Sequence, residues 1–315
     1  MESLKSQLAS LSAEAIQALL LDREDLRVLT RLTTPTLSPL PPEEPGHLVL
    51  LDTEGTGKDA LKDEMVELGM VKVLYCKRTL RLCSIVGRFN QLRDPGIPMP
   101  PEATAVNHIT DEMLVGQSID FAEAAAFIED ADLIVAHNAI YDRQLVERYI
   151  PEFFSKAWAC SFKGIDWASV GINGGKLDYI AFRLGFFYEG HRATVDCEAL
   201  LQVLASMVEG EDGPTTPFEM LATRARTDSF RVYAFGAPFD MKDVLKKRNY
   251  NWHAGETAPE KSWYLDVLDL EALQAEFQWL KEAVYNRRSF SPGVVKFNAF
   301  SRFSSRMPTV KREYL

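Results

Sequence analysis

Two acidic residues stand at the end of a short apolar run, and two glycines follow them. The run is Leu48–Leu51, the acids are Asp52 and Glu54, and the glycines are Gly55 and Gly57. Side chains alternate across a strand, so the two acids would point to one face. Ionised carboxylates are costly to bury without a positive partner. No Lys or Arg lies between the two acids, so the pattern indicates a divalent cation, and oxygen ligands favour Mg²⁺ or Mn²⁺.

This stretch alone has a second interpretation, a strand end and a glycine turn with both acids in water. Further acids must therefore come from elsewhere in the chain. Asp142 lies one turn into a predicted helix that leaves an apolar strand, and Asn138 can cap that helix. His191 stands in a loop five residues before Asp196, which lies on the first turns of the next helix. Taken singly, each position also fits a surface acid or a structural histidine.

Together these positions form a pattern of known type. An Asp-x-Glu ends the first strand, an Asp opens a middle helix, and His-x4-Asp opens a late helix. This order resembles the DnaQ-like 3′→5′ exonucleases of the DEDDh group, the family of the proofreading subunit of DNA polymerase III and of oligoribonuclease. The resemblance covers about residues 46–208 and includes VNHITDEML (106–114) and KLDYIAFRLGF ahead of HRATVDCEAL. Gly55, where many relatives have Thr or another small residue, and Tyr141, where Phe is common, depart from the family pattern.

The resemblance implies an α/β fold of the ribonuclease H-like type, a mixed five-stranded sheet flanked by helices. Composition and periodicity by themselves predict only an α/β layer structure. The implied reaction is hydrolysis at 3′ ends of single-stranded DNA with release of nucleoside 5′-monophosphates, using two divalent cations, Mg²⁺ or Mn²⁺. The resemblance makes four carboxylates the metal ligands and adds a histidine as general base, so the expected catalytic residues are Asp52, Glu54, Asp142, Asp196 and His191.

Substrate-binding residues are expected around the first acidic pair. Glycine lets a backbone approach a ligand closely, so Gly55, Thr56 and Gly57 are predicted to lie against the terminal nucleotide. His108 and Asn138 are also predicted to face the substrate, and a structural role explains each of them equally well.

Besides an endonuclease or an unrelated metal phosphodiesterase, two other functions stay open at this stage. One is a 3′→5′ exoribonuclease or oligoribonuclease, because the residue that senses the 2′-hydroxyl is not identified by these motifs. The other is a non-catalytic nucleic-acid or polymerase-binding module, against which the intact set of five residues argues. The predicted partner is nucleic acid with a free 3′ end, and a polymerase or repair protein is a further candidate.

The chain is predicted to divide into four parts. These are an N-terminal helix and proline-rich linker (1–45), the exonuclease domain (46–210), a linker (211–228) and a small C-terminal α+β domain with a tail (229–315). We expect a helix within 1–30, strands at 47–52, 65–75, 79–90, 132–137 and 158–161, a loop at 94–105, and helices at 121–130, 138–149, 176–184 and 193–208.

Charge distribution, apolar runs and cysteine spacing indicate where in the cell the protein is expected. The net charge is −10, yet the C-terminal part after residue 222 carries more Lys and Arg than Asp and Glu. No apolar run reaches the length of a membrane span, and the N-terminus lacks the features of a signal peptide. The four cysteines form no CxxC pair, so we expect reduced thiols in a cytoplasmic protein with no membrane association.

The C-terminal domain interleaves cations with aromatic residues. Aromatic rings beside cations can stack bases and follow phosphates. The alternatives are that these rings form the core of the small domain or bind a protein partner. The residues in question are Lys246, Lys247, Arg248, Tyr250, Trp252, Lys261, Trp263 and Tyr264.

Overall fold

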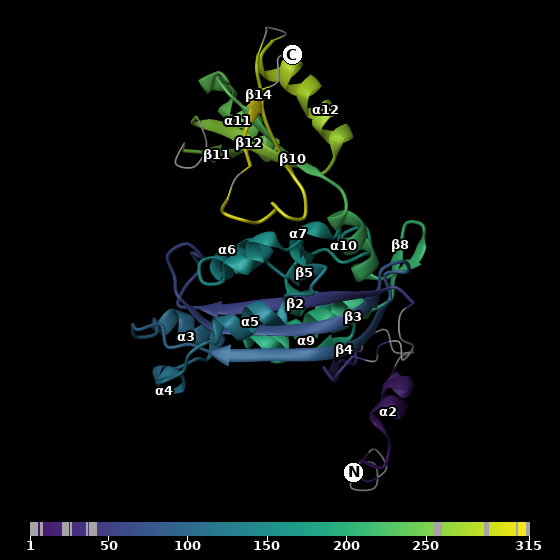
Figure 1. Cartoon of the computed structure of the whole chain (residues 1–315). Helices are drawn as coiled ribbons and strands as arrows, with labels where there is room; N and C mark the ends of the chain where they lie inside the picture. The colour runs from purple at the N-terminus through teal and green to yellow at the C-terminus, as the bar shows by residue number, and fades with distance from the viewer. Residues whose placement is uncertain are drawn as a thin grey trace.

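The first domain is built on a mixed five-stranded sheet (Figure 1). The computed structural model describes residues 6, 9–20, 25, 27–35, 37, 43–254, 260–286, 290–306 and 308–312. Strands β2, β3 and β4 are antiparallel, and β5 and β6 run parallel to β2. In the order β4-β3-β2-β5-β6 the bounds are Leu82–Leu92, Met65–Cys76, Pro45–Gly55, Leu133–Ala136 and Trp158–Cys160. The predicted α/β fold class is confirmed.

Strand β2 contributes to a separate apolar core on each face of the sheet. Leu48 and Leu50 pack in one core with helices α8, α9 and α10, whereas Val49 and Leu51 pack in the other with α5 and α6. The alternation carries on to the strand end, so Asp52 and Glu54 share the face that α9 covers. The helices α5, α6, α8, α9 and α10 span Phe121–Phe127, Ala139–Glu147, Leu177–Arg183, Ala193–Ala205 and Pro217–Ala225.

The predicted loop at 94–105 instead contains helix α3 (Pro101–Asn107). The prolines of this stretch predict a loop, but Pro101 occupies the first helical position. The N–H at that position has no acceptor within the helix, so a proline costs no hydrogen bond there. The other short elements are α4 (Asp111–Leu114), a 3₁₀ turn η1 (Pro151–Ser155), α7 (Ser161–Gly164) and β7 (Phe186–Phe187).

The N-terminal helix is shorter than the region 1–30. Helix α2 (Ala13–Leu20) begins after Ser12, whose hydroxyl oxygen accepts from the Ala15 N–H at 3.2 Å. Residues 27–29 are not helical, and β1 (Thr30–Arg31) pairs in parallel with β7. Several residues of the predicted helix and of the proline-rich linker lie outside the described residues.

The stretch 211–228, expected to be a linker, is instead part of the first domain. Strands β8 (Val208–Gly210) and β9 (Gly213–Thr215) form a hairpin, and α10 follows with the Thr216 hydroxyl capping it. Phe218 and Leu221 of α10 are fully buried in the core that contains α9. Polar and glycine residues at the hairpin turn produced the linker prediction, while the apolar face of α10 determines the packing.

The C-terminal unit has its own five-stranded antiparallel sheet, in the order β11-β12-β10-β13-β14. None of the helices within the described residues is long and apolar enough to cross a membrane. The strands β10 to β14 span, in chain order, Ser229–Ala234, Asn251–His253, Ser262–Val267, Gly293–Phe297 and Lys311–Arg312. The helical segments η2, α11 and α12 span Phe239–Met241, Lys242–Lys247 and Leu270–Trp279, and the π-helical turn η3 spans Leu280–Val284.

The aromatic residues of this unit have mixed environments. Tyr250 is buried and its hydroxyl donates to Glu276 at 2.8 Å, and Trp263 packs against the domain core. Trp252 is 53% exposed and meets Trp263 edge-on. The core interpretation therefore holds for Tyr250 and Trp263, whereas the Trp252 ring is exposed.

After β13 the chain returns to the first domain. We call residues 298–306 the C-terminal brace; Figure 1 shows this yellow segment next to α6 and α7. The fully buried Arg143 of α6 donates to the carbonyl oxygens of Phe300 and Arg302 at 2.8 and 2.7 Å. The Ser304 hydroxyl donates to Glu147 of the same helix at 2.6 Å. The brace therefore fixes α6 against the C-terminal unit.

Candidate active site

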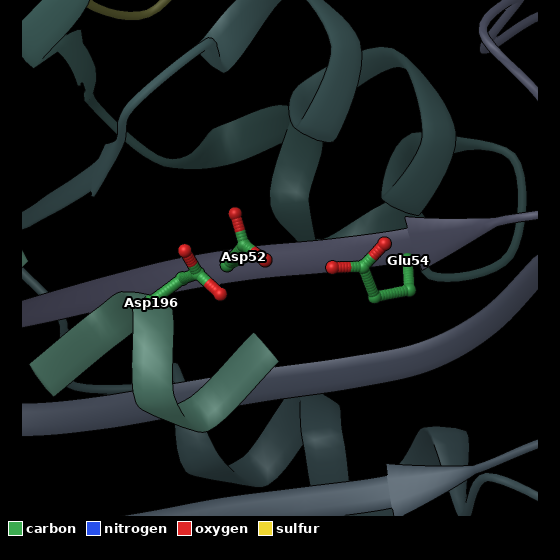
Figure 2. A group of neighbouring side chains, drawn as sticks. All are labelled: Asp52, Glu54 and Asp196. Carbon is green, nitrogen blue, oxygen red and sulfur yellow. The ribbon is translucent and has the colours of Figure 1, made fainter. Parts of the chain in front are cut away.

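Three of the predicted carboxylates meet at the end of β2. Asp52 and Glu54 extend from the strand and Asp196 reaches them from the first turn of α9, as Figure 2 shows. One carboxylate oxygen from each lies within 4.8 Å of the other two. Strand alternation and the packing of α9 on the same face explain this convergence.

Asp142 approaches from the opposite helix layer and lies outside this group of three. It is buried on the first turn of α6, and its Oδ1 accepts from the backbone N–H and hydroxyl of Thr53 at 3.1 and 2.8 Å. Thr53 lies between the two acids of β2, so Asp142 is held directly beside them. Its charge contributes to the raised pKa of Asp52.

The electrostatics of this cluster favour a positive partner. Burial, followed by the charges of Asp142 and Asp196, raises the pKa of Asp52 well above its ordinary value. Burial and the Asp196 charge raise the pKa of Glu54 to about 8, and burial raises the pKa of Asp142 to about 7. Ionising all four carboxylates at neutral pH is therefore unfavourable without a cation. An all-oxygen donor set of this kind fits a hard divalent ion.

Two buried features hold the start of α9 against the sheet. Glu67 is fully buried on β3 and accepts from the Arg192 guanidinium at 3.1 Å and from the Ala193 N–H at 3.2 Å. Gly69 lies opposite Asp52 in the β2–β3 ladder, and a Cβ there would lie 2.6 Å from the Ala193 carbonyl carbon. The absence of a side chain at Gly69 thus lets α9 approach closely enough to bring Asp196 to the cluster.

His191 lies at the rim of the cluster. Its side chain is exposed and its φ of 66° is in the left-handed region. Burial raises the pKa of Asp196, and His191 is close enough to be among the groups that act in the opposite direction. Tyr188, which the sequence did not single out, hydrogen-bonds Asp196 through its side chain. A Cβ on Gly190 would lie 3.3 Å from the Asp196 carboxylate, so this loop passes close to the site.

The turn after the two acids is held by Tyr141. Its hydroxyl donates to the Gly57 carbonyl at 2.8 Å and fills the space where Gly55 lacks a side chain. The two departures from the family pattern, Gly55 and Tyr141, therefore fit each other. Thr56 is buried, its hydroxyl oxygen accepts from the Glu64 N–H at 2.9 Å, and its own N–H donates to the Glu64 carbonyl at 2.9 Å, so its backbone N–H is already engaged.

The remaining predicted substrate residues have exposed side chains. His108 ends α3 with a φ of 58°. Asn138 occupies the N-cap position of α6 as predicted, but its side chain makes no capping hydrogen bond. Buried Asn107, which sequence reasoning missed, donates to the Gly55 carbonyl at 3.3 Å and hydrogen-bonds Glu54. His137 lies within hydrogen-bonding distance of Ser161 and Gly175 and has a structural position.

Solved exonuclease structures show limited similarity to the chain. A structure titled Exonuclease X in complex with 5′ overhanging duplex DNA is 26% identical, with a TM-score of 0.38, and the match covers 49% of this chain and 89% of that one. A zinc-bound E. coli ExoI–ssDNA complex is 11% identical, with a TM-score of 0.47 and coverage of 76% and 71%.

Proteins related in sequence match about half of this chain. The DNA polymerase III subunit epsilon of Treponema pallidum is 29% identical over 170 residues, covering 50% of this chain and 74% of the relative. The corresponding subunit of Aquifex aeolicus is 28% identical over 172 residues, covering 52% and 81%. The chain spans only 12% of the DNA polymerase III PolC-type protein of Thermotoga maritima, with 29% identity. The family model described as Exonuclease matches residues 49–204, a range that contains all five predicted catalytic positions.

Proposed function

Residues 49–204 belong to the exonuclease family in its DnaQ-like 3′→5′ group, and from this premise we propose that the protein degrades single-stranded DNA from its 3′ end. The products would be nucleoside 5′-monophosphates. One observation carries the proposal: carboxylates from β2 and α9 converge within 4.8 Å, beside a fourth on α6.

The proposed cofactors are two divalent cations, Mg²⁺ or Mn²⁺. Asp52, Glu54 and Asp196 would hold them, with Asp142 completing the set from α6. When bound, such ions lower the pKa of water and offset the charge that develops on the departing oxygen. The raised pKa values of Glu54 and Asp142 support this assignment, because a cation would relieve the repulsion that raises them.

The chain's own groups have distinct proposed tasks. His191 would accept the proton of the attacking water, since its exposed ring stands beside Asp196 at the rim. The water oxygen would bond to the phosphorus of the terminal nucleotide, and the bond from that phosphorus to the O3′ of the preceding nucleotide would break. The terminal nucleotide would leave as a 5′-monophosphate, and the departing O3′ would take up a proton from solvent. The backbone of Gly55, Thr56 and Gly57, fixed by Tyr141, would support that nucleotide, with His108 and Asn138 as further contacts.

DNA is preferred over RNA in this proposal because the two relatives that are matched over 74% and 81% of their length are named DNA polymerase III subunits. The same names make a polymerase the proposed protein partner. All four cysteines are free and buried, which supports a cytoplasmic, reducing location.

The test compares single-stranded DNA labelled at either end, duplex DNA and RNA, each with Mg²⁺ and with EDTA. We expect labelled mononucleotide from the 3′ end of single-stranded DNA only with Mg²⁺. Asp52→Asn should lower the rate by at least about 10³-fold while the protein stays folded, because a metal ligand is lost. The control is Asp212→Asn, an exposed acid at the tip of the β8–β9 hairpin. Wild-type activity of the Asp52 variant, or release from the 5′ label, would refute the proposal.

A further inference from the structure

A cleft of about 600 Å³ lies between the first domain and the C-terminal unit. Residues of α6, β6, α7 and α10 form one wall, and residues of β10, β12 and the C-terminal brace form the other. Its lining includes none of the five predicted catalytic residues. The volume is in the range of ligand sites, about 300–1,000 Å³.

The cleft lining carries an excess of positive charge. Arg231 is neutralised by Asp266, with two contacts of 2.6 and 2.8 Å. Lys163, Arg224 and Arg302 also line the cleft, and among the described residues no ion pair joins any of them to a carboxylate. Three positive charges therefore face this space without an acidic partner on its walls.

Arg302 is the most informative of the three. It is nine-tenths buried, and its guanidinium donates only to neutral oxygens, including Ser229 Oγ at 2.9 Å and the Ala225 carbonyl at 3.4 Å. Burial and then the charge of Arg224 lower the pKa of Arg302 to about 10, so the two guanidinium groups repel each other. An anion between them would relieve this repulsion.

The acids that act on these arginines are engaged elsewhere. Asp228 raises the pKa of Arg302 but forms an ion pair with Lys296 at 2.6 Å. Asp269, which acts on Arg224, caps α12 by accepting from the Ala272 N–H at 2.8 Å. Neither acid lines the cleft.

The rest of the lining suits a nucleic-acid strand. Phe230, Phe297 and Phe303 provide ring surfaces among the cations, and cations with aromatic rings are the usual composition of single-strand sites. The lining also includes Leu61 and Ile140, which are 55% and 51% exposed. Leu61 lies in the segment after β2 and Ile140 lies on α6, so the cleft is lined in part by the segment that follows Glu54 and by the helix that carries Asp142.

We propose that this cleft binds the phosphodiester backbone of the single strand whose 3′ end occupies the active site. The inference rests on the proposed function and adds a second contact region to it. The hydrogen bonds between the brace and α6 keep the two walls in place, so the site is formed before the strand binds.

The test measures binding of an oligothymidylate of about 15 nucleotides to the full-length chain in EDTA, over a range of salt concentrations. The variant Lys163→Gln/Arg224→Gln should raise Kd about tenfold or more. It should also reduce the slope of log K against log salt by about 1.4, the value for two lost phosphate contacts on a single strand. The matched control Arg81→Gln/Lys311→Gln also removes one arginine and one lysine, both exposed and outside the cleft lining, and should change neither quantity. The single variant Lys163→Gln, at an exposed position, provides a second measurement if the double variant unfolds.

Equal effects of the cleft and control variants, or no effect of the cleft variants, would overturn the proposal. Thymidine 5′-monophosphate serves as the second ligand. A further outcome is that the mononucleotide depends on Lys163 and Arg224 for binding while oligonucleotide binding is independent of both residues. In that case the cleft is a nucleotide site and the strand assignment fails. Because EDTA prevents Mg²⁺-dependent hydrolysis, this binding result is independent of activity. Intact cleft binding without any 3′→5′ hydrolysis would refute the proposed function alone.

Discussion

At the residue scale, the acidic cluster makes the metal-free protein sensitive to pH. The pKa of Glu54 rises from 4.5 in the unfolded chain to about 8, and that of Asp142 rises from 3.8 to about 7. A raised folded-state pKa gives stability that is complete below the unfolded value and is lost as the pH rises through the folded value. These two groups therefore lower the free energy of unfolding between about pH 4 and pH 8.

We expect this loss in EDTA, and we expect Mg²⁺ at pH 8 to reverse it because the ion binds only the folded cluster. Denaturant unfolding of the wild type and of Glu54→Gln at pH 5 and pH 8 measures the effect. The free energy of unfolding of the variant, relative to that of the wild type, should be higher at pH 8 than at pH 5. A difference that does not change with pH would contradict the assigned electrostatics.

His191 gives a second prediction at this scale. Replacement by alanine should lower the rate of mononucleotide release by about 10²–10⁴-fold, the usual range for a general base. Mg²⁺ binding should be retained, because the carboxylate cluster remains complete; calorimetry checks this. A loss below about threefold would argue against the role of general base.

Sequence reasoning identified the acids but not the groups that orient them. Asp52, Glu54 and Asp196 follow from strand alternation and helix position, and the structure brings them together. Tyr188 contacts Asp196, and Asn107 contacts Glu54, each from another part of the fold. Contacts of this kind depend on how loops fold back, and an isolated Tyr or Asn gives no signal of it in one sequence.

At the element scale, the close contact between β3 and α9 is the critical one. In Gly69→Ala the new Cβ would meet the backbone of Ala193 and Thr194 at 2.6 Å, so α9 must move away from β2. We expect lower thermal stability, weaker Mg²⁺ affinity and a large loss of activity. Gly87→Ala is a suitable control on β4, since its Cβ would meet side chains and no backbone, the Phe127 ring at 3.1 Å and the Lys72 Cβ at 3.8 Å. Equal behaviour of the two variants would show that the close approach at Gly69 is not needed.

The elements themselves were largely predictable where their periodicity was clear. The strands β2, β3 and β5 and the helices α5, α6 and α9 occur where alternation or helical spacing placed them. Helix α3 was missed because the prolines before it suggested a loop, and Pro101 at its first position is compatible with a helix. Strand β1 has two residues and depends on its pairing with β7, which no local pattern reveals.

At the scale of the whole molecule, the two sheets are not independent units. The brace supplies the carbonyl oxygens that accept from buried Arg143, next to Asp142 in sequence. A chain that ends after Phe297 would leave this guanidinium with only Glu147 as partner among the groups described here. Each buried donor left unpaired costs about 1–3 kcal/mol.

We therefore expect a chain ending after Phe297 to unfold at a markedly lower temperature and to lose exonuclease activity. The control is a chain that ends after Arg306, which keeps the brace and loses only the last residues. Thermal unfolding and mononucleotide release measure both proteins. Full stability and activity of the shorter chain would show that the exonuclease domain is complete without the brace.

The division of the chain was the least predictable property. Residues 211–228 looked like a linker from their glycines, prolines and acids, but Phe218 and Leu221 belong to the core of the first domain. The brace joins residues more than 150 positions apart, such as Arg143 and Arg302. Pairings over such separations are set by the packing of whole layers, which one sequence does not encode in any local window.

The contact between α9 and β3 also has a consequence for chemical labelling. Cys197 directly follows Asp196, is fully buried, and its thiol donates to the Gly69 carbonyl at 3.5 Å. Burial raises the pKa of this thiol, so an alkylating reagent has neither access nor a thiolate to attack. Modification requires α9 to lift from β3, the same movement that removes Asp196 from Asp52. The alkylation rate of Cys197 therefore reports how often the metal site comes apart, and a bound cation should slow it.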